Sequence, residues 1–249
     1  MAPSVTLIGS PVSPYVRKVL AACAIKGVEV AVDPITPFMG DDGFSRISPL
    51  RRIPVWIEGD FTLCDSSAIV QYIEETRPGP SLWPADPKDR AQARWLEEFG
   101  DTRLFDVLGW KLFFQIALKP RFFGEETDQA MVAHAREVEL PEILDYLESV
   151  SPEDGFLFGE VCVADFAVTA ACMNLEAIRV SIDADRWPRF AGLIARVQVT
   201  PLGNLNRLAG RMMRTPIEQH REVLPEFGLI PTETTLLGRE VRRGPMTAA

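Results

Sequence analysis

Ser13 and Pro14 form a helix start at which the serine hydroxyl could hold the thiolate of a ligand. Such a site would carry out sulfur chemistry without using a cysteine of the protein itself. The two residues follow a strand-like run at 5–9 and open an apolar helical pattern that ends at Gly27. Serine at the N-cap and proline at the first helical position are typical of a helix start. Unpaired backbone N–H groups and the positive end of the helix dipole at such a start favour a thiolate beside the Ser13 hydroxyl. Ser-Pro also opens many helices that have no chemical role, so this segment alone leaves both interpretations open.

Arg52, Ile53 and Pro54 precede a strand that we expect to begin at Val55. A cis bond between Ile53 and Pro54 would turn the preceding backbone outward, and Val55 would then pair with an extended peptide as a short added strand. The alternative is an ordinary strand start with a trans bond, which is much the commoner form in folded proteins.

Asp65 and Ser66 form a third candidate, at the start of the next predicted helix. The N–H groups of a helix N-terminus bind carboxylates, and the Ser66 hydroxyl adds a donor. Asp65 can accept a hydrogen bond from an ammonium group, so the pair suits the head group of an α-amino acid. An N-cap without a ligand is an equally good interpretation of these two residues alone.

The elements that must position these residues alternate between strands and helices. Alternating valines predict a strand over 28–32, and a short helix is expected at 44–47. Gly59 and Asp60 separate the two strands of a hairpin, and a helix over 68–75 follows. The order β-α-β-(short α)-β-β-α predicts a compact α/β domain.

Beyond Lys88 the strand pattern disappears. Apolar residues at i+4 spacing predict a long amphipathic helix over 104–116, and leucines mark a second helix over 140–147. The segment 164–178 is apolar nearly all round, which predicts a central buried helix. After Arg214 the pattern dissolves, and we expect the rest to be ordered only by packing on another part of the protein.

These patterns divide the chain into an α/β domain and a helical domain. The expected boundaries are an α/β domain at 1–80, a linker at 81–87, an all-helical domain at 88–214 and a C-terminal tail at 215–249.

Composition excludes several classes of function. The 249 residues are 47% hydrophobic and carry a net charge of −9, which argues against nucleic acid and anionic membrane surfaces as partners. No apolar run reaches the roughly 20 residues that span a bilayer, and no signal peptide is visible. The four cysteines have no C-x-x-C spacing, and the chain has two histidines. We therefore expect no metal site, buried reduced cysteines and a cytoplasmic location.

The order and spacing of the three motifs resemble the glutathione-binding half of the cytosolic glutathione transferases. The likeness extends from about Thr6 to about Ala209. It implies that family's fold, an α/β thioredoxin-like N-terminal domain followed by an all-α helical C-terminal domain. The motif Ser-Pro-Tyr-x-Arg-x-Val at 13–19 is similar to the serine-type (tau and zeta) classes, so the chain resembles a bacterial member of that group.

The resemblance also assigns site residues. In the serine-type classes the first serine of the motif activates the glutathione thiol, and Ser13 falls at that position. The other motifs match the family's basic residue, aliphatic residue and cis-proline, and the acidic-Ser segment that holds the γ-glutamyl end. The glutathione-binding residues implied in this way are Arg52, Ile53, Pro54, Asp65 and Ser66.

The resemblance implies a cytoplasmic, homodimeric transferase that acts in detoxification. It takes glutathione as its co-substrate, needs no metal and uses the glutathione thiolate to attack a small hydrophobic electrophile. One hydrogen bond from Ser13 would lower the pKa of the thiol by about one to two units. Ser10 is a second candidate donor, and Arg17 either adds positive charge near the sulfur or forms a surface ion pair.

A pocket for the electrophile is expected between the two halves of the chain. The residues that would line it are Phe105, Trp110 and Phe113. Aromatic residues at helical spacing are more often part of a core, and the adjacent Phe113 and Phe114 cannot both face the same side.

Two other classes of function stay open at this point. A glutathione-dependent thiol–disulfide oxidoreductase is one, although such chemistry usually has a cysteine where Ser13 stands. A non-enzymatic module that kept the fold is the other. The chain also departs from the family pattern at Cys162, where the helical half normally has a capping hydroxyl, at a cost of about 1 kcal/mol. Its tail beyond Arg214 is longer than is usual for the family.

Overall fold

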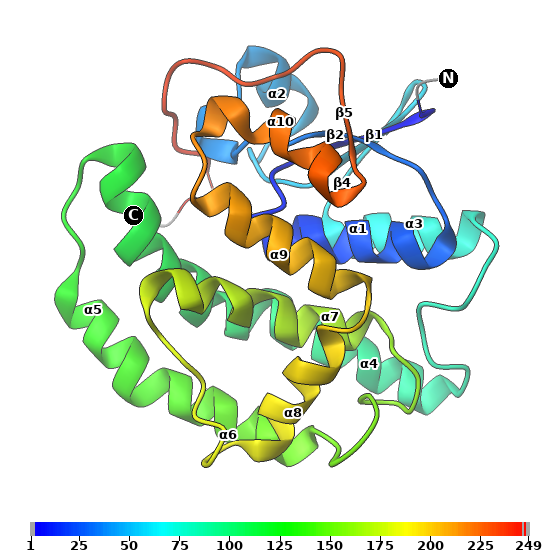
Figure 1. Ribbon diagram of the computed structural model, residues 1–249, viewed down its shortest axis with the longest axis vertical. Coiled ribbons are helices and arrows are strands. Elements are labelled where there is room, and N and C mark those ends of the chain that lie inside the picture. The colour runs from blue at the N-terminus through cyan, green and yellow to red at the C-terminus, as the bar shows by residue number, and fades with distance from the viewer. Residues whose placement is uncertain (1–2, 246, 248–249) are drawn as a thin grey trace. The chain divides into compact units, whose positions relative to one another are not determined.

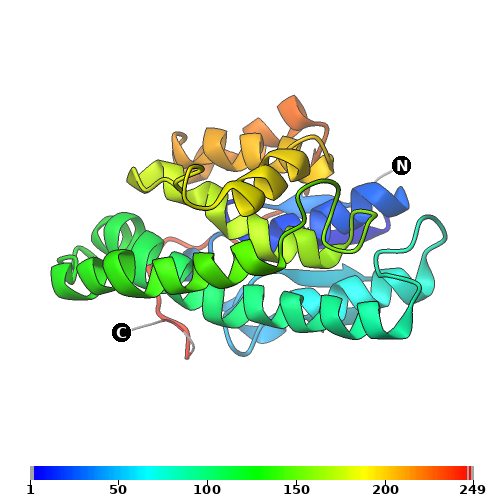
Figure 2. The same cartoon turned by 90° about the horizontal axis from the view of Figure 1, so that it is seen from below.

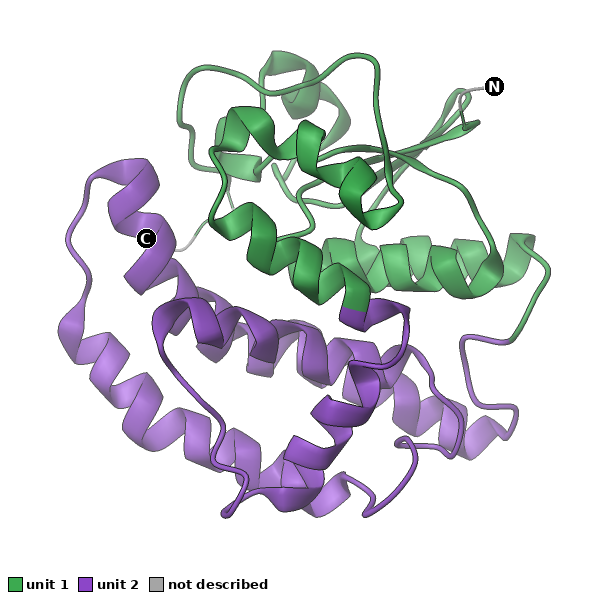
Figure 3. Cartoon of the chain, viewed as in Figure 1, with its two compact units in different colours: residues 1–80, 204–249 green, residues 81–203 purple. Residues whose placement is uncertain are grey.

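The computed structural model describes residues 3–245 and residue 247. Its contacts divide the chain into two compact units, as Figure 3 shows. Unit 1 combines Met1–Pro80 with Asn204–Ala249, and unit 2 is Ser81–Gly203. The segment 215–249 therefore belongs to unit 1. Within the described residues, no helix has both the length and the apolar character required to cross a membrane.

Unit 1 is built on a mixed five-stranded sheet with the order β4-β3-β1-β2-β5. Strand β1 pairs parallel with β2 and antiparallel with β3, which also pairs antiparallel with β4. Strand β5 adds to the far edge of β2 in parallel. The strands are β1 (Val5–Ile8), β2 (Ala31–Asp33), β3 (Val55–Glu58), β4 (Phe61–Cys64) and β5 (Ile230–Pro231). The sequence predicted the first four strands but not β5, which is two residues long and has no alternating pattern.

The helices of unit 1 begin and end with the predicted signals. Ser13 is the N-cap of α1, Pro14 is its first residue, and Gly27 ends it in the left-handed conformation with a φ of 64°. Asp65 caps α3 by accepting hydrogen bonds from the N–H groups of Ser67 and Ala68. The helices before unit 2 are α1 (Pro14–Lys26), η1 (Pro37–Met39), α2 (Asp42–Ile47) and α3 (Ser66–Thr76). Those that follow it are α9 (Pro201–Met213), which starts at the end of unit 2, η6 (Ile217–Gln219), α10 (His220–Val223) and η7 (Leu224–Phe227).

Unit 2 is entirely helical apart from its loops (Figures 1 and 2). The first long helix consists of α4 (Pro87–Phe99), η2 (Gly100–Leu104) and η3 (Asp106–Phe123), with π-type hydrogen bonding from Gly100 onward. The second consists of α5 (Gln129–His134), the π-helical η4 (Ala135–Glu139) and α6 (Leu140–Val150). The remaining helices are α7 (Val163–Ala170), the 3-10 helix η5 (Ala171–Ile178) and α8 (Pro188–Val197).

The core of unit 2 is formed around α7, as the apolar sequence of that segment predicts. All eight residues of α7 are buried. Gly100 permits the close approach of the first long helix, because a Cβ at that position would lie 2.7 Å from the carbonyl oxygen of Ala167. Leu104, Leu108 and Leu112 are each at most 1% exposed, which confirms the predicted buried row.

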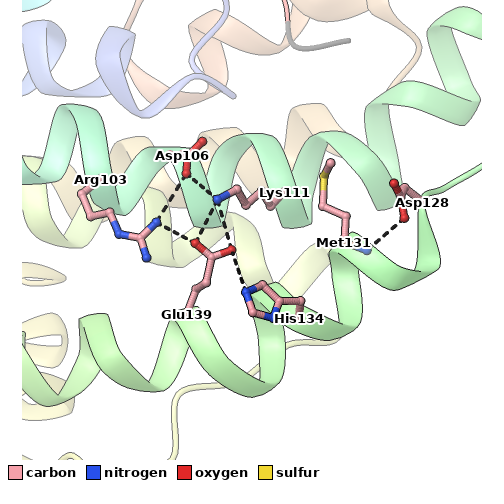
Figure 4. Close-up of polar contacts among 7 residues, drawn as sticks. All are labelled: Arg103, Asp106, Lys111, Asp128, Met131, His134 and Glu139. Atoms are coloured by element: carbon pink, nitrogen blue, oxygen red, sulfur yellow. Dashed lines mark hydrogen bonds and ion pairs between the residues drawn. The ribbon is translucent and has the colours of Figure 1, made fainter.

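An ion-pair network joins the two long helices of unit 2 (Figure 4). The Glu139 carboxylate accepts hydrogen bonds from Arg103 at 2.7 Å and from Lys111 at 2.9 Å. Burial of Glu139 raises its pKa, but the hydrogen bonds from these two cations outweigh that effect and hold the pKa below its usual range. The network thus ties η4 to η2 and η3.

Cys162 occupies the N-cap position of α7. The Asp165 carboxylate accepts hydrogen bonds from the backbone N–H groups of Cys162 at 2.9 Å and of Leu157 at 3.0 Å. The Cys162 thiol faces the N–H groups of Ala164 and Asp165, and burial raises its pKa to about 12. The carboxylate half of a capping box is therefore present, with a thiol where its hydroxyl partner normally stands.

We expect Cys162→Ser to raise the free energy of unfolding by about 0.5–1 kcal/mol, because a hydroxyl is a better acceptor than a thiol at this N-cap. Urea unfolding followed by circular dichroism measures the change. Cys172→Ser is the matched control, since Cys172 is buried inside η5 and a serine there has no helix start to cap. An equal change in the free energy of unfolding in the two variants, of either sign, would contradict the capping role.

Candidate functional site

Ser13 lies half-buried at the start of α1, immediately after the loop that leaves β1. Its backbone is extended, with φ −73° and ψ 127°, as an N-cap requires. Within the part of the chain that the structure describes, its side chain makes no capping hydrogen bond to α1. The hydroxyl is therefore available to a ligand at the positive end of the helix.

Ser10 lies in the same loop but is only 4% exposed. Its hydroxyl accepts a hydrogen bond from the N–H of Val12 at 3.3 Å. Its backbone N–H donates to Ile35, and its carbonyl accepts from the N–H of Ser13 at 2.9 Å. These contacts give Ser10 a part in shaping the loop before Ser13, and contact of its hydroxyl with a ligand stays a prediction.

Arg17 is fully buried, so its interpretation as a surface ion-pair residue is wrong. Its guanidinium donates to the carbonyl oxygens of Pro11 at 2.8 Å and Val12 at 3.1 Å. Burial lowers its pKa to about 9, which leaves the group charged at neutral pH. Arg17 thus binds the two peptide groups that directly precede Ser13.

The peptide bond between Ile53 and Pro54 is cis, as the resemblance implies. The hydroxyl of Ser48 holds Arg52, the residue before Ile53, because it accepts from the N–H of Arg52 at 2.9 Å and donates to its carbonyl at 2.8 Å. The Arg52 side chain is exposed. Ser48 therefore fixes the backbone of the predicted binding segment, while the Arg52 guanidinium remains exposed.

The expectation that Val55 offers a free strand edge is wrong. Strand β3 lies between β1 and β4, and Val55 is in register with Ile8 on one side and Cys64 on the other. An interior strand has no open edge to which a peptide can be added. Any backbone pairing with a ligand must therefore involve residues before Val55, in the irregular segment that contains Arg52 and Ile53.

Gly9 is a residue of the site that the sequence did not identify. Its φ is +146°, and a Cβ there would lie 2.7 Å from a methyl group of Val16 and 2.9 Å from the Cβ of Ile53. A glycine is therefore required for the loop before Ser13 to lie against Ile53. The signal in the sequence is a single glycine directly after a strand, which is too common to have been decisive.

Asp65 is exposed and adopts a φ of +79°, which is rare for a residue other than glycine. Its Oδ1 accepts from Ser67 at 3.0 Å and from Ala68 at 3.2 Å. The other carboxylate oxygen has no role in this cap and is available to an ammonium group. Backbone outliers of this kind are concentrated at binding sites.

Two further residues lie beside this helix start. Ser66 is only 4% exposed. Lys18 of α1 is also buried, and its ammonium group lies 3.2 Å from the hydroxyl of Ser67. This contact joins the first turns of α1 to the first turn of α3, so it links the Ser13 helix with the Asp65 motif.

Arg51 has a structural role, although it stands next to the exposed Arg52. Its φ is +49°, and its guanidinium donates to the carbonyl oxygens of Pro37 at 3.0 Å and Gly40 at 2.8 Å. It also lies over the ring of Phe44. Nothing in the sequence distinguishes the two neighbouring arginines, because the difference is in their backbone conformation.

The aromatic candidates of unit 2 are partly accessible. Phe105 and Trp110 are half-buried and pack edge to face, with ring centroids 5.9 Å apart, whereas Phe113 is only 6% exposed. Trp110 also packs against the fully buried Phe114. These rings form part of the packing of η3, and a role in binding an electrophile stays a prediction.

The arrangement in unit 1 provides three complementary groups: a hydroxyl donor at Ser13, an exposed guanidinium at Arg52, and an exposed carboxylate at Asp65 beside the N–H groups of α3. A small peptide with an amino-acid head group, a carboxylate and a thiol would match all three.

Comparisons with known proteins point to the same chemistry. A family model described as the N-terminal domain of glutathione S-transferase matches residues 7–81, which include all three motifs. A protein named glutathione S-transferase from Hyoscyamus muticus is 31% identical over 202 residues, covering 78% of this chain and 93% of that protein.

Solved structures show the same fold. A glutathione S-transferase from Sinorhizobium meliloti 1021 matches with a TM-score of 0.74 at 21% identity, covering 88% of this chain and 98% of that chain. A second, from Methylobacterium radiotolerans in complex with glutathione sulfonate, matches with a TM-score of 0.66 at 25% identity and covers 80% of this chain and 92% of that chain.

Gly9→Ala should lower the free energy of unfolding by about 2–5 kcal/mol, since it adds crowding against Ile53 and Val16 to an unfavourable backbone conformation. Gly27→Ala is the matched control, because Gly27 also has a positive φ but a Cβ there meets nothing within 4 Å. It should cost about 1–2 kcal/mol. Chemical denaturation compares the two variants, and equal losses would show that Gly9 is needed only for its backbone conformation.

Proposed function

The chain belongs to the glutathione transferase family, and from this premise we propose that Ser13 stabilises the thiolate of bound glutathione for attack on a small hydrophobic electrophile. The observation that carries the proposal is the Ser13 hydroxyl at the N-cap of α1, which makes no capping bond to its own helix within the described residues. The structural relative that holds glutathione sulfonate supports glutathione as the ligand.

The energy of one hydrogen bond is sufficient for this role. A free thiol has a pKa of about 8.5, so only a few per cent is ionised at neutral pH. A hydrogen bond to a charged acceptor contributes about 1.5–3 kcal/mol, and one pKa unit corresponds to about 1.36 kcal/mol. The Ser13 hydroxyl would thus lower the thiol pKa by about one to two units.

Ser13 acts as a hydrogen-bond donor and forms no covalent intermediate. The thiol proton passes to solvent, and the sulfur lone pair then forms a bond to the electrophilic carbon while the bond to the leaving group breaks. The dipole of α1 favours the same thiolate. Arg17 contributes by holding the Pro11 and Val12 carbonyls that precede Ser13.

The remaining motifs bind the rest of the tripeptide. The α-carboxylate of the γ-glutamyl group would lie at the start of α3, near Ser66, and its ammonium group beside the Asp65 oxygen that is not used in the cap. Ile53 and the cis Pro54 would lie along the cysteinyl part, and the exposed Arg52 would face a carboxylate of the ligand.

The cysteines of the protein do not favour the oxidoreductase alternative. All four are unpaired, and three of them, Cys23, Cys162 and Cys172, are buried. Burial raises the pKa of each of these three thiols to about 12, which is the opposite of an activated nucleophile. The relatives named as transferases also favour transfer over the non-enzymatic alternative.

The wider context follows from the family. We propose a homodimer of the 27.7 kDa chain that acts in the cytoplasm, where unpaired cysteines are stable. The half-buried rings of Phe105 and Trp110 would supply apolar surface for the electrophile.

Ser13→Ala should leave the Kd for glutathione within a few-fold while it lowers kcat at neutral pH by about 8- to 25-fold, the loss of ionised thiol expected when its pKa rises from about 6.5–7.5 to about 8.5. In a profile of kcat against pH, the apparent pKa of the acidic limb should rise by the same interval of about one to two pH units. Ser13→Thr, which keeps a hydroxyl, should retain most of the activity. An unchanged pH profile in the alanine variant would contradict the role of Ser13.

Asp65→Asn should weaken glutathione binding by about tenfold and leave the melting temperature unchanged, because asparagine caps a helix as well as aspartate but has no charge. Isothermal titration calorimetry and thermal melts measure the two effects. Asp86→Asn is the matched control, since Asp86 caps α4 through the same pair of hydrogen bonds. Equal affinities in these two variants would exclude a contact between Asp65 and the ammonium group.

A further inference from the structure

Residues 235–244, named the C-terminal strap here, run along the segments of unit 1 that lead to the proposed glutathione site. In Figure 1 the red chain passes from β5 across α2. Strand β5 brings the chain to this place by pairing with β2, and the N–H of Thr232 continues the pairing by donating to the carbonyl of Val32 at 3.1 Å. The strap follows directly.

The buried carboxylate of Asp33 receives the start of the strap. Asp33 ends β2 and is 1% exposed. One of its carboxylate oxygens accepts from the Thr235 hydroxyl and the other from the N–H of Leu236, both at 2.7 Å. The backbone carbonyl of Asp33 accepts from the N–H of Gly9 at 2.8 Å. One residue therefore joins the strap to the loop that precedes Ser13.

The middle of the strap pairs with residues 38–41. The carbonyl of Leu236 accepts from the N–H of Asp41 at 2.9 Å, and the N–H of Gly238 donates to the carbonyl of Met39 at 2.6 Å. The N–H of Arg242 donates to the carbonyl of Phe38 at 2.7 Å. Main-chain hydrogen bonds from the strap therefore hold the segment before α2, and their formation does not depend on the side chains of that segment.

Apolar contacts extend the strap to the binding segment itself. Leu236 and Leu237 pack against a buried cluster that includes Phe44 and Val55, and Ile53 packs on the same cluster. At the end of the strap, a Cβ on Gly244 would lie 2.9 Å from the Cβ of Arg51. The strap therefore lies against Arg51, on one side of Arg52, and packs on the same cluster as Ile53, on the other side.

We propose that the C-terminal strap is a positioning element of the glutathione site, which holds residues 34–54 in the conformation that presents Arg52 and Ile53 to the ligand. Thr235 and Asp33 are its positioning residues. The proposal rests on the proposed function, because the ligand is taken to be glutathione. It assigns a role to a segment that begins 202 positions after Asp33, the residue to which Thr235 donates.

Thr235→Val tests the proposal in the full chain, because it removes the hydroxyl donor to Asp33 and preserves the shape of the side chain. We expect the Kd for glutathione to rise about three- to tenfold, the effect of one hydrogen bond, with kcat unchanged. Hydrogen exchange of the ligand-free protein should become faster by a similar factor in peptides from 34–54 and stay unchanged in peptides from unit 2. Thr235→Ser should restore both values.

Thr232→Val is the matched control, three residues before the strap. The Thr232 hydroxyl donates to the carbonyl of Thr234 at 2.6 Å, a contact within its own segment. This variant should change neither affinity nor exchange. Arg242→Ala, which breaks an exposed ion pair with Asp42, is a milder variant should Thr235→Val fail to fold, and it should change both readouts in the same direction.

The outcomes separate the two hypotheses. Equal glutathione affinity in Thr235→Val and wild type would overturn the strap proposal, even with faster exchange, because the strap would then stabilise the fold without positioning the site. Equal effects of Thr232→Val and Thr235→Val would overturn it as well. A wild-type protein that binds no glutathione in the calorimeter would instead overturn the proposed function.

Discussion

The buried carboxylate of Asp33 is the interaction on which the organisation of unit 1 depends. Its side chain binds the C-terminal strap, and its backbone carbonyl binds the loop that leads to Ser13. Burial raises the pKa of Asp33 despite the hydrogen bonds from Leu236 and Thr235. A buried carboxyl group is expensive unless it is satisfied, so the strand end, the loop and the strap stabilise one another.

Charged residues near the site divide into two sets according to burial. Arg17 directs its guanidinium group at backbone carbonyls of the loop before α1, and Arg51 directs its own at the first residue of η1 and at Gly40, which follows η1. Arg52 and Asp65 keep exposed side chains on a backbone that Ser48 or a helix start holds in place. A site built in this way can present opposite charges to a small peptide with little rearrangement, because its polar groups are oriented before the ligand arrives.

Local signals in the sequence were sufficient for most of the fold. Caps at Ser13 and Asp65, the turn at Gly59 and the leucine row beginning at Leu104 depend on neighbouring residues, so they could be predicted without tertiary contacts. The family resemblance supplied the cis bond before Pro54, which no local pattern settles. The features that were missed or misread depend on distant packing: β5, the burial of Arg17, the interior position of Val55 and the need for glycine at position 9.

The discontinuity of unit 1 has a consequence for how the protein is made. Unit 2 is a single continuous stretch, Ser81–Gly203, whereas unit 1 needs strand β5 and the strap from the far end of the chain. During synthesis on the ribosome, the helical unit has all of its residues before the sheet can acquire its fifth strand. The nascent sheet therefore leaves the β2 edge open until residues 230–231 emerge, and an open edge is where strands from other chains can add. The net charge of −9, which keeps chains apart, offers protection during that interval.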